Sequence, residues 1–88
     1  MNERLIENNI LIYPNPGTGR YTIDFMDQLV TGYLRVFNFQ GSMLYQTRIS
    51  GAEKLELSLS QFENGIYLVN IVTKKTNSTI RVIKTGGM

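Results

Sequence analysis

Few residue types in this chain of 88 residues could act in catalysis or bind a metal. The residue types that are missing exclude several classes of enzyme and metal site. The chain contains no histidine and no cysteine, which removes the usual general base, the thiol nucleophile and most transition-metal ligands. Serine–lysine and paired-carboxylate mechanisms remain open by residue type. No two acids are spaced to share a cleft, and no compact run of oxygen ligands suits calcium: the acids outside the N-terminus are Asp24, Asp27, Glu53, Glu56 and Glu63. We therefore predict no catalytic residue, no enzyme, no metal site and no cofactor.

The segment Tyr13-Pro14-Asn15-Pro16-Gly17 is the first of three motifs that could carry a function. Each proline lacks a backbone donor and fixes φ, so this segment has to turn or cross between sheets. Turn chemistry accounts for all of its residues. We interpret Pro14, Asn15 and Pro16 as a structural corner.

The second motif, Asn64-Gly65-Ile66-Tyr67, places turn residues directly before an apolar segment. Gly65 tolerates backbone angles that other residues avoid, which suits a turn. Tyr67 is predicted to be a core aromatic, since large aromatic side chains dominate cores of this kind.

The third motif is Arg81-Val82-Ile83-Lys84, close to the C-terminus. Strand alternation places 81 and 83 on one face and 80, 82 and 84 on the other, so the two charges should diverge. A charged terminal strand either protects a sheet edge against pairing or forms a recognition surface. Both interpretations stay open for Arg81 and Lys84.

Short apolar or alternating segments recur along the chain, bounded by Gly, Asn, Pro or Ser. One hairpin should turn at Gln40-Gly41, and one helical turn is plausible over 59–64. The segment 66–73 is almost continuously apolar and predicts a central strand covered on both sides. The expected strands are 10–13, 20–25, 33–39, 43–49, 55–59, 66–73 and 78–84.

This pattern predicts an all-β fold, a small immunoglobulin-like antiparallel β-sandwich of about seven strands. Its hydrophobic fraction of 42% is that of a globular domain. We expect a leader or linker over 1–9, the sandwich over 10–84 and a flexible tail over 85–88. The net charge of +2 is scattered, which argues against nucleic-acid binding, and no apolar run is long enough for a transmembrane segment.

The N-terminal nine residues mix acids and amides, where a signal peptide needs a basic start and an apolar stretch. We therefore expect either a cytoplasmic protein or a fragment from the C-terminal end of a longer exported protein.

Taken together, the three motifs and the segments between them resemble the type A C-terminal sorting domain of type IX (Por) secretion cargo proteins. The resemblance runs from Ile12 to Lys84 and includes residues 34–41 (LRVFNFQG) and 57–69 (LSLSQFENGIYLV). Gly65 and Tyr67 match the family's Gly-x-Tyr position, while Arg81 and Lys84 match its terminal basic position. Arg81 stands where lysine is frequent, and Thr85-Gly86-Gly87-Met88 continues past the basic strand.

The resemblance implies that this domain is a sorting signal for a cargo domain that lies upstream in the same chain. Its cargo would cross the periplasm, pass the type IX translocon and reach the cell surface or the medium, where a sortase removes the domain. Recognition would fall on Arg81, Lys84, Gly65 and Tyr67. We expect the last strand to present unpaired backbone groups to a partner strand, and the same edge could mediate self-association.

Two other functions stay open at this stage. A cell-surface adhesion or carbohydrate-binding sandwich would need an exposed aromatic platform, for which the candidates are Tyr13, Tyr33, Phe39 and Tyr45. A spacer between domains would need substantial chain on both sides, which the position of Lys84 disfavours.

Overall fold

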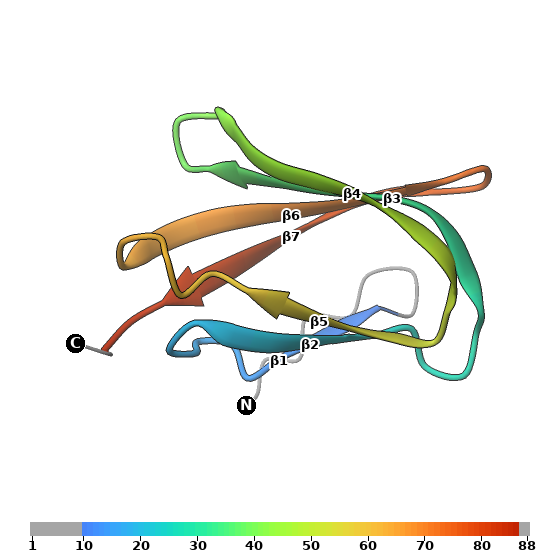
Figure 1. The fold of residues 1–88 in the computed structure, drawn as a ribbon, viewed down its shortest axis with the longest axis horizontal. Coiled ribbons are helices and arrows are strands. Elements are labelled where there is room, and N and C mark those ends of the chain that lie inside the picture. The colour runs from blue at the N-terminus through green and yellow to red at the C-terminus, as the bar shows by residue number, and fades with distance from the viewer. Residues whose placement is uncertain (1–9, 87–88) are drawn as a thin grey trace.

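The structure is a computed structural model that describes residues 10–86, and these residues form seven strands (Figure 1). The leader expected over 1–9 and the last two residues of the expected tail lie outside the described residues. The strands are β1 (Leu11–Tyr13), β2 (Arg20–Asp24), β3 (Val30–Asn38), β4 (Met43–Ala52), β5 (Lys54–Ser58), β6 (Gly65–Thr73) and β7 (Asn77–Lys84).

The strands form two antiparallel sheets, which confirms the predicted all-β sandwich. A three-stranded sheet has the order β1-β2-β5, and a four-stranded sheet has the order β4-β3-β6-β7. The chain passes from β4 almost directly into β5, so these two strands connect the sheets at the right-hand side of Figure 1. Strand β7 is an edge strand of the four-stranded sheet, and its neighbour β6 is an interior strand.

The predicted hairpin between β3 and β4 turns at Gln40-Gly41, as expected. Gly41 has a φ of 94°, and its N–H donates to the carbonyl of Asn38 at 3.0 Å. The segment 59–64 contains no helix. It makes one turn, closed by the Phe62 N–H donating to the Leu59 carbonyl at 3.0 Å.

The inner faces of both sheets meet in one apolar core. Residues such as Ile23, Val36, Val69, Ile71 and Val82 have no exposed surface. Burying such side chains completely stabilises the fold by about 1.5 to 3 kcal/mol each.

The expectation that β6 is covered on both sides is wrong. Its inward residues are buried, but Ile66, Leu68 and Val72 on the opposite face are only half-buried. The reason is that a two-layer sandwich gives each sheet a single partner sheet, so the outer face meets no other layer. The apolar character of β6 therefore extends onto the surface.

Candidate functional site

The alternation predicted for the last strand is confirmed. In β7, Ile80 and Val82 are buried in the core and Arg81 is exposed on the outer face. Lys84 lies on the inner side and is only 8% exposed. The two charges therefore diverge. A recognition surface formed by both residues would need both side chains to be exposed, but the Lys84 side chain lies on the inward face of the strand and is buried.

Asn15, between the two prolines of the corner, binds the outer edge of β7. Its side-chain amide donates to the Arg81 carbonyl at 2.9 Å, and its side-chain oxygen accepts from the Ile83 N–H at 3.0 Å. A neighbouring parallel strand would make the same pair of bonds with its backbone. The carboxamide thus substitutes for a strand residue opposite Val82. Both Tyr13–Pro14 and Asn15–Pro16 are cis peptide bonds.

Gly17 continues this pairing with its backbone. Its N–H donates to the Ile83 carbonyl at 2.9 Å, and its carbonyl accepts from the Thr85 N–H at 2.9 Å, which forms a parallel bridge with Lys84. Asn15 and Gly17 together bind the outward backbone groups from the Arg81 carbonyl to the Thr85 N–H. The expectation that a partner strand reads unpaired groups at this end of β7 is therefore wrong, because the Pro-Asn-Pro corner already pairs with them.

The close approach of Gly17 depends on its missing side chain. A Cβ at this position would come within 2.6 Å of the Tyr21 ring. The Tyr21 hydroxyl donates to the Ile83 carbonyl at 2.9 Å, so this carbonyl accepts from two donors. Burial raises the pKa of the Tyr21 phenol, and the nearby Tyr67 phenol raises it further.

The end of β7 is also held from its inner side. The Lys84 ammonium donates to the Asn64 side-chain oxygen at 3.1 Å, and the amide of the same asparagine donates to the Gly86 carbonyl at 3.1 Å. Gly65 stands opposite Lys84 in the β6–β7 register. We call Asn15, Gly17, Tyr21, Asn64 and Lys84 the C-terminal clasp, because each of them binds the segment 81–86 or belongs to it.

Tyr67 is a core aromatic, as predicted. It is 6% exposed, its ring centroid lies 6.1 Å from that of Phe62, and its hydroxyl donates to the Glu63 carbonyl. Burial raises the pKa of Tyr67, and the Glu63 carboxylate raises it further. The adjacent Gly65 has open space beside it, since a Cβ there would meet no atom within 4 Å.

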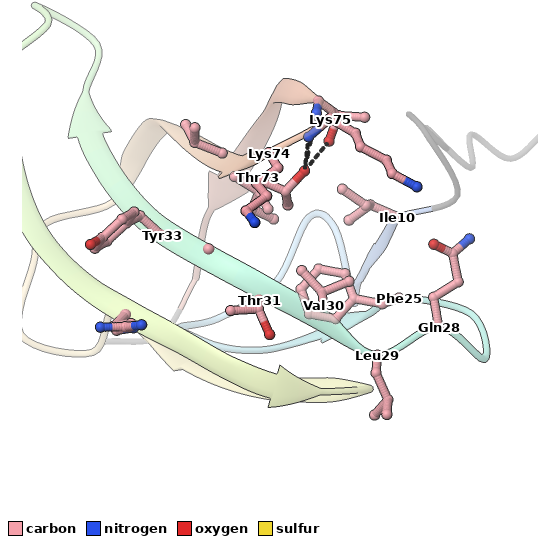
Figure 2. A pocket seen from close by; sticks show the side chains of 15 residues that line it. Ile10, Phe25, Gln28, Leu29, Val30, Thr31, Tyr33, Thr73, Lys74 and Lys75 are labelled. Atoms are coloured by element: carbon pink, nitrogen blue, oxygen red, sulfur yellow. Dashed lines mark hydrogen bonds between the residues drawn. The ribbon is translucent and has the colours of Figure 1, made fainter.

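A pocket of ≈ 680 Å³ opens at the end of the sandwich near the β6–β7 hairpin. Figure 2 shows it bounded by the loop that carries Gln28 and Leu29 and, across the view, by the hairpin that carries Lys74 and Lys75. The buried side chains of Ile10 and Phe25 line it as well. The sequence did not predict this pocket, because its lining comes from distant segments.

The four aromatic candidates for a binding platform are all exposed, but they are scattered. Tyr13 lies on β1 in the three-stranded sheet, and Phe39 lies in the β3–β4 turn. Tyr33 is on the outer face of the four-stranded sheet, while Tyr45 pairs with the buried Val36 and so belongs to the opposite face. They do not build one aromatic platform.

Among residues 10–86, no three side chains of His, Cys, Asp or Glu gather closely enough to hold a metal ion. The same part of the chain contains no helix long and apolar enough to cross a membrane.

The sequence identified the three motifs but did not predict that their residues contact one another in the fold. Asn15 is 66 residues from Arg81, and Asn64 is 20 residues from Lys84. The only available signal was the odd placement of a lone asparagine between two prolines. The structure brings the Asn15, Asn64 and Lys84 members of the motifs to one end of β7.

Comparison with known proteins gives the following findings. The family model described as "Secretion system C-terminal sorting domain" matches residues 11–85. No curated protein matches the chain in sequence. Among solved structures, the chain is similar to a DUF3244 family protein from Bacteroides vulgatus, described as having an immunoglobulin-like β-sandwich fold. That match has a TM-score of 0.74 at 15% identity, covering 88% of this chain and 85% of the other. This likeness confirms the immunoglobulin-like fold.

Proposed function

This chain belongs to the family of secretion system C-terminal sorting domains, and from that premise we propose that it is a type A domain. Families of this kind act as sorting signals and are generally non-catalytic. In this proposal, the domain directs a cargo protein in the same chain through the type IX translocon. The single observation that carries the proposal is the family match over residues 11–85, which includes all three motifs.

The proposed organisation follows the motif order. Residues 10–84 are the sorting unit, residues 1–9 join it to the cargo, and residues 85–88 are its tail. The cargo passes through the periplasm and reaches the cell surface or the medium, where a sortase removes the domain. An edge for self-association would be β4, since β7 is paired from Arg81 to Thr85.

The four proposed recognition residues have different parts in this scheme. Arg81 is exposed and available to a partner. Lys84 and Tyr67 act on the inside, where they fix the last strand and the turn before β6. Gly65 leaves open space beside Lys84 at the start of β6. The clasp supports the idea that the translocon reads a folded, closed end of β7 instead of a free strand.

Fusing residues 1–88 behind a signal peptide and a fluorescent reporter, in a host with a type IX system, tests the proposal. We expect the reporter to become accessible to protease on intact cells. The same fusion in a host that lacks the translocon is the matched control, and it should stay in the periplasm. Equal periplasmic retention in both hosts would refute the sorting function.

A separate pair of variants tests the residue assignments. Arg81→Ala should reduce delivery while leaving the unfolding midpoint in urea unchanged, because this side chain makes no hydrogen bond within residues 10–86. Lys84→Ala should lower the unfolding midpoint, because it removes the bond to Asn64. Full delivery of a folded Arg81→Ala domain would remove the recognition role of that residue.

A further inference from the structure

The charges of the two sheets are distributed unequally. Strands β3, β4, β6 and β7 contain no aspartate or glutamate. In the three-stranded sheet, the basic residues Arg20 and Lys54 are balanced by two acids, Asp24 opposite Lys54 and Glu56 opposite Thr22. The four-stranded sheet is thus the cationic layer of the molecule.

The cations on the outer face of this sheet are all arginines. Arg35 on β3, Arg48 on β4 and Arg81 on β7 point away from the core, since each alternates with inward residues. Every lysine outside the N-terminal nine residues lies elsewhere: Lys54 is on β5, Lys74 and Lys75 are in the β6–β7 hairpin and Lys84 faces inward. Arginine matches carboxylates with a planar fork of donors, which lysine lacks.

Apolar side chains lie between these arginines. Tyr33 pairs with Arg48 across β3 and β4 and is 42% exposed. Phe37 pairs with Leu68 across β3 and β6, and Leu68 pairs with Arg81 across β6 and β7. These six residues, which we call the arginine face, are Tyr33, Arg35, Phe37, Arg48, Leu68 and Arg81. With strands about 4.8 Å apart, the face crosses roughly 15 Å of the sheet.

Edge protection accounts for Arg48 and Arg81, which lie on the edge strands β4 and β7, but not for Arg35. Charged residues that prevent strand pairing belong on edge strands. Arg35 is on β3, an interior strand bonded to β4 and β6. Within residues 10–86, its side chain makes no hydrogen bond or ion pair. Its guanidinium therefore has no part in holding the described fold together.

We infer that the arginine face is the docking surface for an acidic protein of the secretion machinery, a more specific partner that rests on the proposed sorting function. The centres of protein interfaces are enriched in tyrosine, phenylalanine and arginine and depleted in lysine, which is the composition of this face. A second copy that docked through its own arginine face would present the same positive charge and be repelled. Carboxylates on the partner complement the three arginines.

The test compares arginines on the outward faces of the two sheets. Both lie on interior strands. Arg35 is in the middle of β3, between Gln46 of β4 and Asn70 of β6, and Arg20 is at the start of β2, opposite Ser58 of β5. Arg35→Glu and Arg20→Glu are introduced singly into the reporter fusion of residues 1–88, and each purified 88-residue chain is checked for folding by circular dichroism and urea unfolding. Both substitutions change the net charge equally.

We expect Arg35→Glu to lower surface delivery roughly tenfold, because a reversed charge replaces attraction with repulsion at the contact. Arg81→Glu should act in the same direction, and Arg20→Glu should leave delivery within about twofold of wild type. Normal delivery of a folded Arg35→Glu domain overturns the inference while the sorting function stands. Retention of the unmodified fusion in the periplasm overturns both.

A second measurement separates a protein partner from a lipid surface. The purified chain is sedimented with phosphatidylcholine vesicles that either contain or lack phosphatidylglycerol. We expect no binding that depends on Arg35. Sedimentation with the anionic vesicles that Arg35→Glu abolishes would overturn the assignment to an acidic protein and point to anionic lipid.

Discussion

Replacing Asn15 by alanine is the sharpest test of the clasp. The change removes the bond from the side-chain amide to the Arg81 carbonyl and the bond from the Ile83 N–H to the side-chain oxygen. A protein hydrogen bond contributes about 1 kcal/mol net, so the expected loss is about 2 kcal/mol. A domain of this length has roughly 4 to 13 kcal/mol of total stability, so this loss is a large share of it.

The assay combines urea unfolding with amide hydrogen exchange. In Asn15→Ala the free energy of unfolding should fall by about 2 kcal/mol, with a drop of roughly 8 to 16 °C in the melting temperature. Exchange should speed up at the Ile83 amide, whose partner has gone, before it does so in the core. Thr18→Ala is the control, since Thr18 is exposed in the same loop and makes no hydrogen bond within residues 10–86.

Two results would refute the reasoning about Asn15. One is a loss of stability no larger than that of Thr18→Ala. The other is an Ile83 amide that stays as protected as in the unmodified chain, which would mean that the backbone of the corner, not the asparagine side chain, closes this edge.

Three further predictions concern the interior. Lys84→Ala should cost about 1 to 2 kcal/mol in urea unfolding, whereas Lys84→Met, which keeps the apolar stem, should recover part of the loss; equal costs would show that the stem contributes nothing. The raised pKa values of Tyr21 and Tyr67 mean that the folded state holds these phenolic protons more tightly than the unfolded state. Stability should therefore be fully present below about pH 10 and fall as pH rises above it, and Tyr67→Phe should flatten this fall; an unchanged slope would contradict the assignment. Ile71→Ala, at a site with no exposed surface, should cost about 2 to 5 kcal/mol by the same unfolding assay, and a cost below about 1 kcal/mol would contradict its place in the core.

The strands and their inward faces could be predicted because their signals are local. Alternation in the segments that became β2 and β7 gave the correct inward residues, including the divergence of Arg81 and Lys84. The hairpin at Gln40-Gly41 was also correct, since a glycine with positive φ is a local requirement of that turn.

The errors arose where the outcome depended on neighbouring strands. An unbroken apolar segment is consistent with burial on both sides, so the half-exposed outer face of β6 was missed. The C-terminal end of the β7 edge was expected to be free, but the corner 66 residues away binds it from the Arg81 carbonyl to the Thr85 N–H. The role of Lys84 changed for the same reason, because its partner Asn64 comes from another element.

The sequence by itself determined the strand pattern, the absence of histidine and cysteine, and the three motifs by which the family is recognised. The tertiary structure decided that Asn15 closes the end of β7 and that three arginines share one acid-free face. The physical reason is that side-chain direction repeats every two residues along a strand, so the local sequence is enough to predict it. Which strands become neighbours, and in which register, is fixed only when the two sheets bury their apolar faces against each other.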